Sequence, residues 1–93
     1  MNKKRDRLHV IYDILKCINE KDGKIKPTHI LYKSNLSHQM MEEYIKELIE
    51  KDFINEHKSK EGNSKTYSIT SKGQEYLNQY KMIVNFTNSF GLN

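Results

Sequence analysis

The sequence predicts an α+β fold that is mainly helical, with a single two-stranded hairpin. Apolar residues recur at helical spacing in several segments, most clearly over residues 37–51. Residues Tyr67–Thr70 alternate with a period of two instead, which indicates a β-strand. The length of 93 residues suits one small domain over residues 1–93, and the charged fraction of 30% is typical of a soluble globular chain.

The first helix is expected from about Asp6 to Asn19, where apolar side chains form a helical stripe. After it, residues 20–23 read as a turn that ends in Gly23, and Ile25 points inward from a short extended piece. The stripe comprises Leu8, Ile11, Leu15 and Ile18, and it is widened by Tyr12 and Ile14.

Pro27 fits the first turn of a short second helix, because proline lacks the N–H that would be unpaired there anyway. Its expected buried face is formed by Ile30, Leu31 and Tyr32. The polar residues 33–35 then make a turn, and Leu36 fills the core beneath it.

Ser37 is the expected N-cap of a third helix that ends near Lys51. Asp52 follows where the chain must reverse, and aspartate tolerates the left-handed conformation better than most residues. The helix gathers one apolar arc at about 100° per residue. That arc contains Met41, Tyr44, Ile45, Leu48 and Ile49.

Segments 54–58 and 65–70 are expected to pair as a hairpin around a polar tip. Thr70 or Ser71 then caps a last helix that runs to about Phe90. Steps of four and three along this helix indicate a short heptad-like seam. The seam comprises Tyr76, Tyr80, Ile83, Thr87 and Phe90.

The charge distribution favours an anionic partner. The net charge is +4 and the sequence pI is about 9.1, yet the third helix is net acidic and its flanks are basic. The four histidines are scattered and no catalytic constellation appears, so we expect no enzyme, no metal site and no cofactor. A lone cysteine, Cys17, favours a reducing interior, and no apolar run is long enough for a membrane span. We therefore expect a cytoplasmic, nucleoid-associated protein.

Three core helices, a two-stranded wing and a long C-terminal helix, in this order, are the architecture of a winged helix-turn-helix. Residues Asn35–Ser37 with Tyr44–Ile45 and Leu48–Ile49 resemble the third helix of small archaeal winged-helix regulators. The junction Tyr67–Gly73 resembles their Tyr-x-Leu-Thr-x-Lys-Gly motif. Over about residues 7–80 the chain is similar to archaeal chromatin-associated winged-helix dimers. The resemblance implies binding to double-stranded DNA and a homodimer formed through the C-terminal helix.

In this arrangement the third helix enters the major groove with its N-terminal turn against the bases. Lysines beside the second helix and on the wing would hold phosphates. The alternatives are a merely solvated helix face and ordinary solubility charges. The candidate DNA-binding residues are Ser37, His38, Gln39 and Met40 on the helix, Lys24, Lys26 and Lys33 beside the second helix, and Lys58, Lys60, Asn63 and Lys65 on the wing.

Residues 74–90 are expected to form the dimerisation helix, because its apolar side chains are too many for one face of so small a body. The alternative is that this segment folds back over the first helix. The candidate interface residues are Tyr80, Ile83, Val84, Phe86 and Phe90.

The sequence thus predicts a dimeric DNA-binding protein that acts as a transcriptional regulator or as an architectural protein of chromatin. The alternative is a winged-helix module that docks onto another protein without binding DNA. The acidic third helix and the uncharged segment after Met82 are what that alternative predicts.

Overall fold

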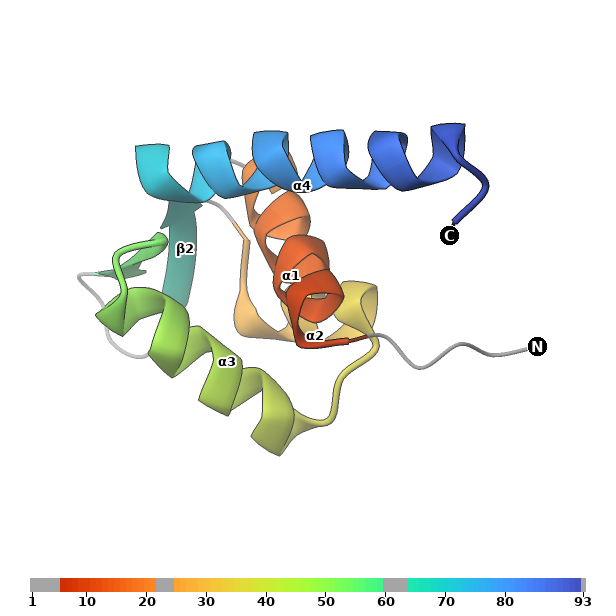
Figure 1. Ribbon diagram of the computed structural model, residues 1–93. Coiled ribbons are helices and arrows are strands. Elements are labelled where there is room, and N and C mark those ends of the chain that lie inside the picture. The colour runs from red at the N-terminus through yellow and green to blue at the C-terminus, as the bar shows by residue number, and fades with distance from the viewer. Residues whose placement is uncertain (1–5, 22–24, 60–63, 93) are drawn as a thin grey trace.

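The computed structural model describes residues 6–21, 25–59 and 64–92, whose elements follow in the order α1, α2, α3, β1, β2, α4 (Figure 1). The helices are α1 (Arg7–Lys21), α2 (Pro27–Ser34), α3 (His38–Glu50) and α4 (Ser71–Ser89). Strands β1 (Ile54–Lys58) and β2 (Lys65–Ile69) form an antiparallel hairpin. The predicted class, mainly helical α+β with a three-helix core, a wing and a long last helix, is confirmed.

Helix α1 lies in the middle of the molecule, with α4 on one side of it and α2 and α3 on the other (Figure 1). Its buried arc is centred on Ile14 and Ile18, both fully buried. Leu8 was predicted to belong to this stripe, but 54% of it is exposed. It lies about 100° around the helix from the centre of the arc, and Val10 and Cys17 take the buried positions instead.

Helix α2 buries one narrow stripe, because it has only two turns. Ile30 and Ser34 are fully buried one turn apart. The prediction that Tyr32 belongs to this face is wrong, since Tyr32 is 79% exposed. Two positions from Ile30 correspond to about 200° of rotation, which places Tyr32 on the opposite side. Leu36 is buried after the helix, as predicted.

The limits of α3 follow the local chemistry of the chain. Ser37 caps the helix, and its Oγ accepts a hydrogen bond from the Met40 backbone N–H at 3.2 Å. At the other end Asp52 takes the predicted left-handed conformation, with φ of 64°. The Phe53 N–H then bonds back to the Leu48 carbonyl at 2.9 Å, which satisfies a carbonyl of the last turn.

The wing is fixed to the core at its base and carries charge towards its tip. Ile54 pairs with Ile69 at the base, whereas Lys58 pairs with Lys65 at the far end. Tyr67 is buried, and a single β-bridge to Ile25 ties this strand to the segment before α2. Ile25 is fully buried, as predicted, and its bridge to Tyr67 attaches the middle of β2 to the core.

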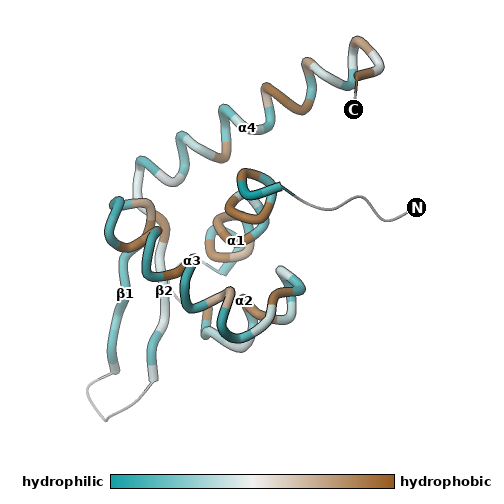
Figure 2. The backbone as a smooth tube through the Cα atoms, turned by 60° about the horizontal axis from the view of Figure 1, so that its bottom comes forward, coloured by the Kyte–Doolittle hydropathy of each residue, from teal (hydrophilic) through white to brown (hydrophobic). Residues whose placement is uncertain are grey.

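Helix α4 has two unlike halves. Thr70 is its N-cap, and the side chain of Leu77 is buried against the core. The Tyr76 hydroxyl donates to the Leu8 carbonyl at 2.6 Å, and the Tyr80 ring stacks on Tyr12 with the ring centroids 4.6 Å apart. Beyond Tyr80 the helix extends past α1 (Figures 1 and 2), and its apolar side chains stay exposed.

Candidate nucleic-acid interface

The first turn of α3 presents the predicted base-reading side chains to solvent. Ser37, His38, Gln39 and Met40 are all exposed. Two of them are engaged by glutamates one turn further on. Gln39 Nε2 donates to Glu43 Oε1 at 3.3 Å, and His38 Nδ1 lies 3.6 Å from Glu42 Oε1. A protonated His38 would partly offset the charge of Glu42, and an amide bound at one N–H keeps its oxygen and second N–H for another partner.

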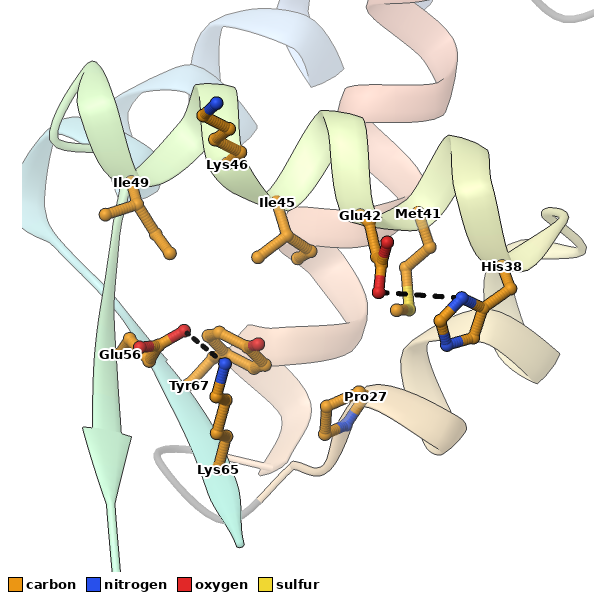
Figure 3. A pocket seen from close by; sticks show the side chains of 10 residues that line it. All are labelled: Pro27, His38, Met41, Glu42, Ile45, Lys46, Ile49, Glu56, Lys65 and Tyr67. Carbon is orange, nitrogen blue, oxygen red and sulfur yellow. Dashed lines mark ion pairs between the residues drawn. The ribbon is translucent and has the colours of Figure 1, made fainter. Parts of the chain in front are cut away.

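A groove of about 380 Å³ separates α3 from the wing (Figure 3). Its floor is apolar, with Met41, Ile45 and Tyr67 pointing into it, and its rim is charged. Lys65 Nζ lies 3.9 Å from Glu56 Oε2 at the wing side of the rim. Lys46 and Glu42 stand on the α3 side, so both signs of charge alternate around the opening.

The predicted basic residues flank α3 on two sides. Lys26 precedes α2 as its N-cap residue, Lys33 stands in the last turn of α2, and both are exposed. Lys58 and Lys65 are exposed and directly opposite each other in the ladder. Like charges in directly opposed positions destabilise a hairpin. Lys24, Lys60 and Asn63 lie outside the described residues.

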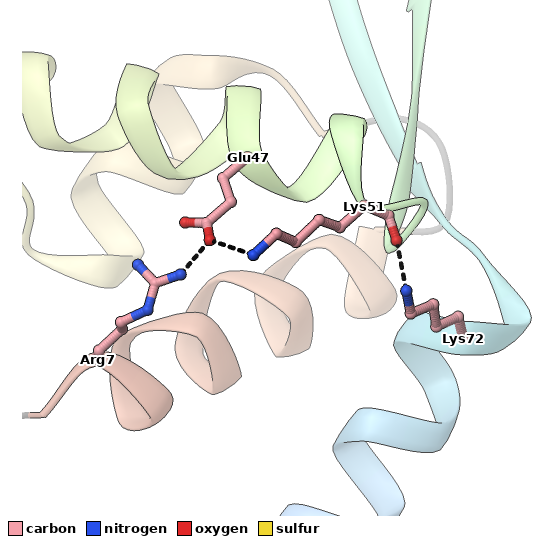
Figure 4. Close-up of polar contacts among 4 residues, drawn as sticks. All are labelled: Arg7, Glu47, Lys51 and Lys72. Atoms are coloured by element: carbon pink, nitrogen blue, oxygen red, sulfur yellow. Dashed lines mark hydrogen bonds and ion pairs between the residues drawn. The ribbon is translucent and has the colours of Figure 1, made fainter.

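A second group of charges lies on the flank of α3 that faces away from the wing (Figure 4). Arg7 Nη2 donates to Glu47 Oε2, and Lys51 Nζ donates to the same oxygen at 3.0 Å. The two cations lower the pKa of the Glu47 carboxyl, and Glu47 raises the pKa of Arg7. The Arg7 guanidinium also lies over the Tyr44 ring, 5.8 Å from its centroid.

The sequence groups Arg7 with Lys3, Lys4 and Arg5 in a basic N-terminal segment, interpreted either as a flexible arm for DNA or as a disordered polar end. The contact of Arg7 with Glu47 was not predicted. The available signal was the position of Arg7 at the start of an amphipathic helix. The Glu47–Lys51 spacing of four was visible as an intrahelical pair, but its partner 40 positions earlier was not.

The predicted dimer residues divide between the two halves of α4. Tyr80 stacks on Tyr12 of its own domain and is only partly exposed. Ile83, Val84, Phe86 and Phe90 are exposed on the projecting half, and Phe86 and Phe90 contact each other with centroids 5.0 Å apart. Tyr80 thus joins the packed half to an apolar surface that no part of the described chain covers.

Neither a metal cluster nor a membrane helix is present in the part of the chain that the structure describes. No three His, Cys, Asp or Glu side chains gather there in a way that could hold a metal ion. No helix among those residues is long and apolar enough to cross a bilayer.

Comparison with known proteins agrees with this geometry. The sequence model of a family described as winged helix-turn-helix matches residues 4–88. The chain belongs to this family. A relative in sequence is the uncharacterized protein MJ0290 of Methanocaldococcus jannaschii, 31% identical over 80 residues. The match covers 86% of this chain, which spans about a third (34%) of that relative.

Solved structures show the same winged helix-turn-helix fold. Sso10a-2, a DNA-binding protein from Sulfolobus solfataricus, superposes with a TM-score of 0.78 at 20% identity, over 92% of this chain and 85% of that one. FabT of Streptococcus pneumoniae, solved in complex with DNA, superposes with a TM-score of 0.69 at 12% identity. That match covers 85% of this chain and 55% of FabT.

Proposed function

We propose that this protein is a dimeric DNA-binding protein of the cytoplasm and nucleoid, acting as a transcriptional regulator or as an architectural protein of chromatin. It binds without chemistry. The first turn of α3 enters the major groove, and the wing and α2 hold the backbone. The structural neighbours that bind DNA, Sso10a-2 and FabT, support this assignment through their fold.

The observation that carries the proposal is the pairing of Lys58 with Lys65 across the wing. Two ammonium groups in opposed positions repel each other, so the free hairpin loses stability through them. A phosphate between or beside them removes that repulsion and gains two charge-assisted contacts. Glu56 offsets one of the two lysines at 3.9 Å, which leaves the wing net positive.

The decisive experiment measures affinity for a labelled duplex across a salt series. The logarithm of the affinity should fall linearly with the logarithm of the salt concentration, by about 0.9 for each phosphate neutralised. A double charge reversal, Lys58→Glu with Lys65→Glu, should abolish binding, whereas Lys81→Glu on α4 should not. If the wild-type protein fails to bind duplex DNA at low salt, the assignment is wrong.

The dimer part of the proposal rests on the projecting half of α4, where Phe86 is 60% and Phe90 66% exposed. Each phenylalanine buried at an interface contributes on the order of 2 kcal/mol. We expect sedimentation equilibrium to give a dimer for the wild type and a monomer for Phe86→Ser with Phe90→Ser. A monomeric wild type at micromolar concentration would contradict this part alone.

The second candidate is a protein-docking module, favoured by the acidic front of α3. The exposed side of α3 carries three glutamates and one lysine, namely Glu42, Glu43, Glu50 and Lys46. Near phosphate these carboxylates repel, whereas a basic protein surface would attract them. The Lys58→Glu and Lys65→Glu reversal separates the two functions, because a docking module should keep its partner when the wing turns acidic.

A further inference from the structure

The structure places two cations on the flank of α3 that neither the wing nor α2 occupies. Arg7 comes from the start of α1 and Lys51 from the end of α3, and Glu47 holds both (Figure 4). The three side chains sum to one net positive charge. Both cations are accessible, since the side chains of Arg7 and Lys51 are 54% and 60% exposed.

This flank and the wing groove lie on different sides of α3. Glu42 lines the groove against the wing, whereas Glu47 lines the hollow beside Arg7. Five positions separate the two glutamates, which corresponds to about 140° around the helix. Gln39 and its partner Glu43 therefore lie between the flank that faces the wing and the flank that carries Arg7 and Lys51.

The width of the DNA major groove indicates what the two flanks of α3 would contact. A helix with its side chains is about 10–12 Å across, and the major groove is about 12 Å wide, so a helix in the groove has a phosphate backbone on each side. The wing lysines serve only one of these two backbones. With α3 in the groove, the other strand would pass along the flank that Arg7 and Lys51 occupy.

We propose that Arg7 and Lys51, held side by side by Glu47, form a phosphate-binding site for the second DNA strand. This inference rests on the proposed function and adds a site to it. Glu47 is its positioning residue: the carboxylate cancels one charge, but it fixes two long side chains that would otherwise lose rotamer entropy on binding. Arginine in this position offers further N–H groups to a phosphate after one is given to Glu47.

The test compares variants that each remove one positive charge. Arg7→Gln and Lys51→Gln should each lower the slope of log affinity against log salt by about 0.9 on a duplex. If variant and wild type have equal affinity at 1 M salt, a slope difference of about 0.9 corresponds to binding weakened about eightfold at 0.1 M. The matched control, Lys81→Gln on α4, should keep the wild-type slope. Circular dichroism checks that each variant is folded. If Arg7→Gln does not fold, Lys51→Gln alone tests the site.

A double variant distinguishes two roles of Arg7: direct contact with a phosphate, and neutralisation of the Glu47 carboxylate. If Arg7 binds phosphate itself, Arg7→Gln with Glu47→Gln keeps the lowered slope. A return to the wild-type slope would mean that Arg7 acts only by cancelling Glu47, and it would overturn the site.

The inference and the proposed function can fail separately. If Lys65→Gln lowers the salt slope while Arg7→Gln and Lys51→Gln match Lys81→Gln, the protein binds DNA and the second site is wrong. If the wild type does not bind DNA, both are wrong.

Discussion

Gly73 is a position where a single methyl group should reveal how closely α4 packs on the wing. A Cβ at this residue would lie 2.5 Å from the Phe53 carbonyl oxygen and 2.5 Å from Ile69 Cγ1. Ordinary contacts between such atoms begin at 3.4 Å, so Gly73→Ala forces a shift of roughly 1 Å. The Phe53 oxygen cannot move independently, because it accepts from the Thr70 N–H at 3.1 Å and from the Thr70 hydroxyl at 2.9 Å.

The expected cost exceeds the gain in helix propensity. Alanine is favoured over glycine within a helix by about 1 kcal/mol. Overpacking costs about 1–3 kcal/mol, and disturbing the Thr70 cap adds about 1 kcal/mol. The net loss is therefore about 2 kcal/mol, which lowers the melting temperature of a domain of this size by about 10 °C.

Thermal unfolding followed by circular dichroism, at fixed protein concentration, measures this effect. Asn78→Ala, an exposed position on the same helix, is the control and should leave the melting temperature within about 2 °C or raise it. If Gly73→Ala proves as stable as the wild type, α4 does not dock on Phe53 and Ile69 at the stated distance.

Three further outcomes are expected. Thr70→Ala should lower the free energy of unfolding by about 1 kcal/mol in urea denaturation, because the Gly73 N–H loses its cap at 3.1 Å. Burial raises the pKa of Tyr76 to about 12, so its contribution to stability is complete below pH 10 and is lost as the pH rises towards 12. Tyr76→Phe should shrink that alkaline loss, measured as the change in unfolding free energy with pH. Burial also raises the pKa of the Cys17 thiol, so a disulfide reagent at neutral pH should label native protein far more slowly than unfolded protein.

Features set by neighbouring residues could be predicted from the sequence. The Ser37 cap, the left-handed Asp52 and the two strand segments of the hairpin each depend on a few adjacent residues and their backbone preferences. The apolar arc of α3 was predictable for a related reason, since the helical period alone decides which side chains share a face.

Features set by the angle between helices could not be predicted. The contact from Arg7 to Glu47 spans 40 positions and depends on how α1 crosses α3. The sequence therefore named candidate residues on the wing side of α3, but it did not place Arg7 beside Glu47 on the other flank. Leu8 and Tyr32 are a different case: both are exposed, and the helical period already places them about 100° and 200° from the buried positions of their helices.

The division of α4 into a packed and a projecting half also sets a length scale for the proposed dimer. A helix rises 1.5 Å per residue, so inserting one heptad after Tyr80 would move each winged unit by about 10.5 Å, or roughly three base pairs along DNA. Seven residues also return the apolar seam close to its original face. In the proposed dimer, the length of the projecting half would therefore set which spacing of paired DNA sites both units can occupy at once.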